Sequence, residues 1–275
     1  MTNPKGTSCM TVATSTHIEQ RTNLRNDLRI ALPPGDLTFT QDEEWCVVRL
    51  NGKWREIRLH DYDELFAVPG LYERLIYDIL KCDSPARIRK LFEAELDACD
   101  TPASTLRVLD LGAGNGMIGE ELADIGVEFV VGVDIIEAAA EATQRDRPGV
   151  YADYHVVDMT RLNQGDRREL AGHGFNCLTC VAALGFGDIP TKAFANAYNL
   201  IEPGGWIAFN IKSSFLDQDD TSGFARLVQS VMADKTLEVR KTQRYQHRVG
   251  TSRQPIQYTA IVGNKRSDIG NGMLL

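Results

Sequence analysis

From residue 106 to about residue 265, short apolar runs alternate with segments whose apolar residues recur every three or four positions. The runs at 108–111 and 129–133 are short and rich in Val, Leu and Phe, which is typical of buried strands. The segment 118–125 carries its apolar residues at spacings of four and three, which is typical of an amphipathic helix. Strands that alternate with helices predict an α/β fold with a parallel sheet and helices on both faces.

The stretch before this alternation, residues 25–105, has a different pattern. An Asn-Gly dipeptide at 51–52 joins two β-prone segments, which predicts a β-hairpin. Helical spacing follows over 71–79 and again after Ser-Pro at 84–85, where we expect an N-cap and a first helical position. We therefore expect residues 25–105 to form an N-terminal β-hairpin and helical cap beside a main domain over 106–265.

Neither end of the chain shows such a pattern. Residues 1–24 contain few apolar residues, so we expect a disordered tail there, and residues 266–275 are expected to be a loose tail. No run reaches the length of a membrane span, and residues 1–22 contain no apolar signal region. A cytoplasmic location is the default expectation.

Charge and cysteine usage narrow the function classes. The formal net charge of −8 argues against a broad nucleic-acid footprint, since binding phosphates requires clustered positive charge.

Cys177 and Cys180 have the spacing of a redox or metal motif, but they stand on a predicted buried strand. Residues three apart on a strand face opposite sides of its sheet. We expect buried structural thiols there and no metal site, because no second Cys-x-x-Cys and no nearby histidine pair completes a ligand set.

The turn after the first strand of the main domain carries the clearest chemistry. Gly112, Gly114 and Gly116 follow a strand and precede a helix, an arrangement that suits an adenosine-containing ligand. A dinucleotide fingerprint requires a third glycine where Met117 stands. Asp110, two residues before the first glycine, would repel phosphate but attract a positively charged ligand.

The string Asp-Leu-Gly-Ala-Gly-Asn-Gly at 110–116 resembles motif I of the class I S-adenosylmethionine-dependent methyltransferases. The resemblance implies S-adenosyl-L-methionine as cofactor, with S-adenosyl-L-homocysteine as its product. Within this motif the cofactor-binding residues are Asp110, Gly112, Ala113, Gly114 and Gly116.

Two further acids follow predicted strands. Asp134 stands twenty residues after Gly114, at the distance expected for an acid that binds the ribose hydroxyls. The resemblance implies that Asp158 faces the adenine amino group and that Ile135 packs on the adenine ring. The expected cofactor site is completed by Met159, Ala182 and Tyr62.

The resemblance also specifies the fold. It implies a Rossmann-like, doubly wound and mostly parallel sheet of seven strands, with the segments 237–249 and 257–262 as an antiparallel edge hairpin. The Pro-Gly-Gly at 203–205 matches the break that this family often has before its fifth strand. Together with Asn-Cys-Leu at 176–178 and Tyr-Asp-Glu-Leu at 62–65, it is similar to the methyltransferase-like protein 27 group.

The sequence does not identify a catalytic residue. Tyr62, Tyr72 and Tyr77 are candidates to cover the cofactor, although each also suits an aromatic core position. His60 is a candidate base or a surface residue at a helix entry, and Asp188 is either substrate-facing or a cap for the helix that Pro190 begins.

A small-molecule acceptor leads among the possible substrates. No Asn-Pro-Pro-Tyr, Asp-Pro-Pro-Tyr or Pro-Cys follows the fourth strand, and the paired acids of metal-dependent catechol-type enzymes are missing near 182–184 and 209–211. The alternatives are a non-catalytic protein that binds S-adenosylmethionine or S-adenosylhomocysteine, an RNA or protein methyltransferase, and a nicotinamide-dependent oxidoreductase, although the chain lacks Tyr-x-x-x-Lys. The RNA alternative depends on a basic cluster on the edge hairpin, which also suits a charged edge strand: Arg240, Lys241, Arg244, His247, Arg248 and Arg253, with Tyr245 between them. The sequence does not predict the oligomeric state.

Overall fold

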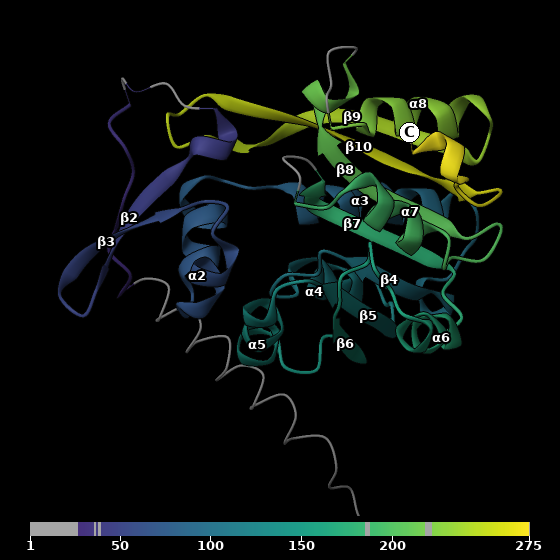
Figure 1. Cartoon of the computed structure of the whole chain (residues 1–275), viewed down its shortest axis with the longest axis horizontal. Coiled ribbons are helices and arrows are strands. Elements are labelled where there is room, and N and C mark those ends of the chain that lie inside the picture. Colours follow the sequence, from purple (N-terminus) through teal and green to yellow (C-terminus); the bar gives the residue numbers. More distant parts are fainter. Residues whose placement is uncertain (1–26, 36, 38–39, 185–187, 218–221, 275) are drawn as a thin grey trace, which may run out of the picture.

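The computed structural model describes residues 27–35, 37, 40–184, 188–217 and 222–274. The tail expected at residues 1–24 lies outside these ranges. Within them the chain forms a large sheet flanked by helices and a small N-terminal sheet beside it (Figure 1). No helix in these ranges is both long and apolar enough to cross a membrane.

The large sheet has seven strands in the order β6-β5-β4-β7-β8-β10-β9. Its strands are β4 (Arg107–Leu111), β5 (Phe129–Asp134), β6 (Asp153–Val156), β7 (Cys177–Leu184), β8 (Trp206–Lys212), β9 (Leu237–Val249) and β10 (Pro255–Lys265). Strands β4 to β8 are parallel, and β10 runs antiparallel to both β8 and β9. The predicted Rossmann-like fold with an antiparallel edge hairpin is confirmed.

Helices cover both faces of this sheet. They are α3 (Ser84–Asp97), α4 (Met117–Asp124), α5 (Glu137–Asp146), α6 (Gln164–Gly172), α7 (Thr191–Tyr198) and α8 (Phe224–Ala233). Apolar residues of α3 and α4 pack with Val108 and Cys177 on one face, while those of α7 and α8 pack with Leu109 and Cys180 on the other. The two cysteines therefore face opposite sides of β7, and burial raises the pKa of both thiols.

The N-terminal sheet contains the predicted hairpin, formed by β2 (Trp45–Leu50) and β3 (Lys53–Arg58). Its turn has positive φ at Asn51 and Gly52, as a two-residue hairpin turn requires. A short strand that the sequence analysis missed, β1 (Ile30–Ala31), pairs with β2. Further short helical segments are α2 (Tyr62–Ala67), the π-helical η2 (Glu73–Ile79), and the 3-10 turns η1 (Gln41–Glu43), η3 (Ala103–Thr105) and η4 (Ser213–Leu216).

Two boundaries differ from the sequence-based expectation. Helix α3 begins at Ser84 with Asp83 as its N-cap, so Ser84 lies inside the first turn, and its hydroxyl contacts Tyr245 and His247 instead. The segment after β10 was expected to be loose, yet Ile269 is only 4% exposed. Both backbone polar groups of Ile269 bond to the side chain of Asn199, and the 3-10 turn η5 (Asn271–Met273) follows.

A buried ion pair connects the N-terminal region to the main domain. The Arg147 guanidinium, after α5, donates to Glu73 of η2 at 2.6 Å, and the two side chains are only 3% and 1% exposed. Arg147 also donates to Glu120 at 2.8 Å and to the backbone oxygen of Asn115 at 3.1 Å. Since Asn115 belongs to the glycine-rich turn, this pair fixes the turn against the N-terminal region.

We expect Arg147→Met to lower the free energy of unfolding by about 3–5 kcal/mol, because it removes the buried partner charge of Glu73. Urea unfolding followed by circular dichroism measures the loss. The matched control is Arg161→Met, since that side chain is 86% exposed and should have little effect. Equal midpoints for Arg147→Met and the wild-type chain would contradict this assignment.

Candidate functional site

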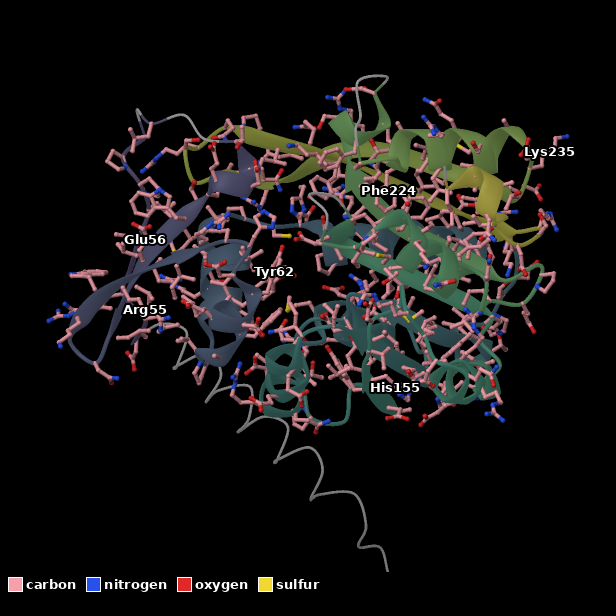
Figure 2. The ribbon with its side chains drawn as sticks, viewed as in Figure 1. Arg55, Glu56, Tyr62, His155, Phe224 and Lys235 are labelled. Atoms are coloured by element: carbon pink, nitrogen blue, oxygen red, sulfur yellow. The ribbon has the colours of Figure 1, made fainter. Side chains whose placement is uncertain are left out.

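A cavity of about 300 Å³ opens where β4, β5 and β7 end, with the segment after β6 along one side. The carboxyl ends of parallel strands are where α/β sheets bind ligands. Eight of the predicted cofactor-binding residues line it: Tyr62, Gly112, Gly114, Asp134, Ile135, Asp158, Met159 and Ala182. Tyr62 projects from the side of α2 that faces the main sheet (Figure 2).

The glycine-rich turn forms the floor of this cavity and is held by hydrogen bonds. The N–H of Gly114 donates to Asp134 Oδ2 at 2.9 Å, and its carbonyl accepts from Thr143 at 2.8 Å and Tyr154 at 2.9 Å. Gly114 has a φ of +54°, and Gly112 has a φ of +71° with only 2.7 Å between an added Cβ and the Cβ of Ala183. Glycine is required at both positions, and the turn is rigid in the shape that the cavity needs.

Asp134, at the end of β5, combines a structural role with an open side. Its Oδ1 accepts from the N–H groups of Ile135 and Ile136, at 2.8 and 3.1 Å. Burial raises the pKa of this carboxyl, while the backbone donors oppose the shift. A carboxylate has about four acceptor positions, so one remains for a ligand hydroxyl after these three bonds. Beside it, the Ile135 side chain is 60% exposed and offers an apolar face to a flat ring.

Asp158 and Met159 also line the cavity, on the segment that follows β6. Asp158 is partly exposed, and hydrogen bonds from the hydroxyl and N–H of Thr160 lower its pKa. Its carboxylate is therefore charged at neutral pH and accepts hydrogen bonds. This matches the chemistry needed to bind an exocyclic amino group.

Three predicted cofactor-binding residues do not line the cavity: Asp110, Ala113 and Gly116. Asp110 is fully buried, and its carboxyl accepts from the Tyr151 hydroxyl at 2.6 Å and from Thr179 at 2.8 Å. Ala113 donates its N–H to Val133, and Gly116 is the N-cap of α4. These three residues support the turn, so direct contact with the ligand stays a prediction for them.

An aromatic wall from the N-terminal region closes the cavity on the other side. Phe66 lies between Tyr62 and Tyr72, with ring-centre distances of 6.2 and 4.7 Å. The sequence analysis missed Phe66, although its spacing of four from Tyr62 places both on one helical face. Tyr77, the third candidate, contacts Tyr72 but does not line the cavity.

A second cavity of about 30 Å³ adjoins the first and shares Tyr62, Tyr72, Ala182, Ala183 and Asp188 with it. Most of its remaining wall is polar: Gln41, His60, His247, Arg248 and Tyr258, with Leu59, Ile76 and Leu184. The second cavity is thus built mainly by the N-terminal region and the β9-β10 hairpin.

His60 and Asp188, both left open by the sequence, form a pair at this second cavity. Their Nδ1 and Oδ2 atoms are 3.2 Å apart. Asp188 does not cap α7, whose N-cap is Pro190 without a side-chain bond. Because a carboxylate only accepts, His60 donates from Nδ1, and this tautomer has its basic lone pair on Nε2.

The basic cluster expected on the edge hairpin is divided between buried and exposed positions. His247 and Arg248 are buried, and burial with the nearby Arg248 charge lowers the pKa of His247. Arg248 pairs with Glu44 at 2.5 Å, and Arg240 pairs with Glu95 at 3.1 Å. The exposed residues of the cluster that the structure does not pair with an acid are Lys241, Arg244 and Arg253.

The wild-type chain should lose folding stability as the pH rises, because the buried Asp110 must ionise. We expect Asp110→Asn to remove this loss. Burial raises the pKa of Asp110 from 3.8 to about 7, so the folded state binds a proton that the unfolded state releases. Stability from this group is therefore present below pH 3.8 and lost as pH rises towards about 7. The loss amounts to about 4 kcal/mol at most, at 1.36 kcal/mol for each pKa unit.

The measurement compares urea unfolding of Asp110→Asn and the wild-type chain at pH 5 and pH 8. The variant should gain stability relative to wild type at the higher pH, because Thr179 can still donate to the amide oxygen and Tyr151 can accept from its nitrogen. A difference that does not change with pH would show that Asp110 is already ionised in the folded chain.

Comparison with known proteins agrees with this geometry. A family described as a methyltransferase domain matches residues 108–205. The chain is 29% identical over 109 residues to a ubiquinone biosynthesis O-methyltransferase of Thiobacillus denitrificans, covering 40% of this chain and 45% of that protein. It is 32% identical over 114 residues to the protein of the same name from Paraburkholderia phymatum, covering 39% and 47%. The chain thus spans about half the length of the curated relatives that it matches.

Solved structures resemble the chain more distantly. A putative RNA methyltransferase from Pyrococcus horikoshii has a TM-score of 0.49 at 12% identity, covering 92% of this chain and 99% of that chain. Magnesium protoporphyrin IX methyltransferase from Synechocystis PCC 6803 has a TM-score of 0.47 at 18% identity, covering 75% and 98%. Neither similarity indicates an acceptor. The narrower resemblance to the methyltransferase-like protein 27 group stays a prediction. The motif, the sheet and the methyltransferase domain matched at residues 108–205 together support the class I S-adenosylmethionine-dependent methyltransferase superfamily.

Proposed function

We propose that this protein is an S-adenosylmethionine-dependent methyltransferase that acts on a small-molecule acceptor. The observation that carries the proposal is the large cavity, where an open carboxylate acceptor on Asp134 lies beside a rigid glycine turn and the exposed face of Ile135. In this proposal residues 106–265 bind the cofactor, and residues 25–105 cover it.

The cavity residues fit an adenosine ligand. Asp134 would accept from a ribose hydroxyl, Ile135 and Met159 would contact the adenine ring, and Asp158 would accept from its amino group. The close approach of the ligand to the turn depends on Gly112 and Gly114. A Cβ at either position would crowd side chains of the cavity wall, Ala183 at Gly112 and Phe66 at Gly114. When bound, the cofactor supplies a methyl group on a positively charged sulfur, with a thioether as leaving group.

The chain's own residues then position the reactants and exclude water. The aromatic wall of Tyr62, Phe66 and Tyr72 attracts a cation through its ring faces. Burial raises the pKa of Tyr62 and Tyr72, so their hydroxyls stay protonated and can donate hydrogen bonds.

We further propose a hydroxyl group as the methyl acceptor, with only that hydroxyl placed at the small second cavity. A hydroxyl carries a proton that must leave during attack, and His60 Nε2 has the basic lone pair to accept it. Asp188 would stabilise the resulting imidazolium and keep the ring oriented. Gln41, only 7% exposed, lines the same cavity, and its buried Oε1 has no hydrogen-bond partner among the residues that the structure describes. This oxygen suits a donor on the acceptor molecule, and the relatives named O-methyltransferases are consistent with a hydroxyl substrate.

The alternatives receive less support. An RNA or protein methyltransferase would need an exposed surface for its substrate, whereas His247 and Arg248 of the basic cluster are buried. A non-catalytic cofactor-binding protein would give no role to the His60–Asp188 pair beside the cavity. A cytoplasmic location remains part of the proposal.

We expect Asp134→Ala to weaken S-adenosylhomocysteine binding by about 1–3 kcal/mol, the scale of lost hydrogen bonds to a charged group. The ribose loses its acceptor, and the N–H of Gly114 loses a partner. Isothermal titration calorimetry measures the dissociation constant, and circular dichroism checks folding. An unchanged dissociation constant in a folded variant would remove Asp134 from the cofactor site and count against the proposed function.

We expect His60→Gln to lower kcat by roughly 10²–10⁴-fold on a hydroxylated aromatic acceptor, because the hydroxyl proton loses its base. A panel of catechols and phenols, assayed by S-adenosylhomocysteine release, identifies the acceptor first. The affinity for S-adenosylhomocysteine should stay within twofold of wild type, since His60 does not line the large cavity. Full activity in His60→Gln would exclude His60 as the base while leaving the cofactor site intact.

A further inference from the structure

Three side chains with metal-ligating atoms gather at the opposite end of β6 from the cofactor cavity. Asp153 and His155 stand on this edge strand, and His173 directly follows α6. One ligand atom from each lies within 4.8 Å of the others. His155 is labelled on the lower edge of the sheet in Figure 2. None of the three residues lines either cavity, so the cluster is separate from the proposed active site.

Each of the two imidazoles in this cluster has one ring nitrogen, Nε2, without a hydrogen bond among the described residues. Nε2 of His155 and Nε2 of His173 are both buried and have no hydrogen-bond partner within the part of the chain that the structure describes. His155 Nε2 lies 3.2 Å from Asp153 Oδ2, but the two are not aligned as a hydrogen bond. Buried polar atoms in native proteins are nearly always paired, so these nitrogens indicate a missing partner such as an ion.

We propose that Asp153, His155 and His173 bind one Zn²⁺ ion. Two imidazole nitrogens and one carboxylate oxygen form a ligand set that Zn²⁺ accepts, with water as a fourth ligand. A single ion gives both orphaned nitrogens and the carboxylate a shared partner. The Asp153 side chain is 48% exposed, so the ion has access from solvent.

The charges and rings around the cluster are consistent with a site of modest affinity. The Arg107 guanidinium lies 3.9 Å above the Phe129 ring and donates to the His173 carbonyl at 2.6 Å, so one positive charge opposes the ion. The Asp153 carboxylate partly compensates this charge, and its other oxygen already accepts from the N–H of Tyr154. Phe129 and Phe175 pack on the His173 ring and limit its rotation, which favours a preformed site.

The ion would link the edge strand β6 to the end of helix α6. Strand β6 has only four residues and pairs with β5 alone. Ligation of His173 would connect this strand to the end of α6, a polar helix in which Leu170 is the one buried residue. We therefore expect Zn²⁺ to act as a stabilising ion and not as part of methyl transfer.

The test uses the full chain without an affinity tag, treated with chelator and then dialysed. Isothermal titration calorimetry with ZnCl₂ should give one site, and Co²⁺ should give visible absorption bands typical of nitrogen and oxygen ligation. The temperature of unfolding should rise with added Zn²⁺, because a ligand that binds the folded state stabilises it.

Phenylalanine variants separate ligation from ring packing. His155→Phe and His173→Phe keep an aromatic ring but remove both nitrogens, so each should weaken Zn²⁺ binding at least tenfold and abolish the thermal shift. His60→Gln is the matched control, since it removes the other histidine that pairs with an aspartate and should leave Zn²⁺ affinity unchanged. Asp153→Asn, at a half-exposed position, gives a third variant should either ring replacement fail to fold.

Absence of Zn²⁺ binding to the wild-type chain would overturn the proposal. So would binding that survives in His155→Phe and His173→Phe, or binding that disappears in His60→Gln. S-adenosylhomocysteine titrations run in parallel are independent of these outcomes, because the cofactor cavity shares no residue with the cluster.

Discussion

The hydrogen bonds around the Gly114 peptide are the constraint on which the site depends. Its N–H donates to Asp134 from the next strand, and its carbonyl accepts from Thr143 on α5 and Tyr154 on β6. The turn after β4 is therefore fixed by two strands and a helix, and the N–H and carbonyl of Gly114 are satisfied by the protein itself. A ligand can lie close to a turn held in this way, and binding does not have to order the loop. The entropic cost of binding is therefore smaller.

The buried Glu73–Arg147 pair extends this rigidity to the N-terminal region. Arg147 binds Glu73 of η2 and the backbone of Asn115 in the turn, so the segment that carries Tyr72 is fixed relative to the turn. The aromatic wall thus belongs to the same rigid assembly as the cavity floor. A buried pair is costly to desolvate, and its retention here fits a role in positioning more than in stability.

The sequence was informative where the pattern is local. Periodicity predicted the alternation of strands and helices in the main domain, and the glycine spacing located the ligand-binding turn. The family resemblance then supplied the seven-stranded sheet and several of the eight predicted residues that line the cavity. The sequence was less informative about side-chain contacts between residues that are far apart along the chain. Phe66 is an ordinary apolar residue in the sequence, and its place in the aromatic wall depends on how α2 packs against α5. The same limit applies to His155 and His173, which are eighteen residues apart in sequence, and to His60 and Asp188.

Burial also decides what a recognised residue can do. Asp110 and Asp134 both follow apolar runs and were both expected to contact the ligand, yet only Asp134 lines the cavity. Asp110 lies two residues before the turn, on the interior of β4, where Tyr151 and Thr179 bind its oxygens. The Tyr151 ring also packs against the backbone of Gly119 and Gly132, so closely that a Cβ at either position would clash with it. The acid of the motif would therefore affect a ligand through the shape of the turn that it supports, and its charge would reach a positively charged ligand only through the intervening protein.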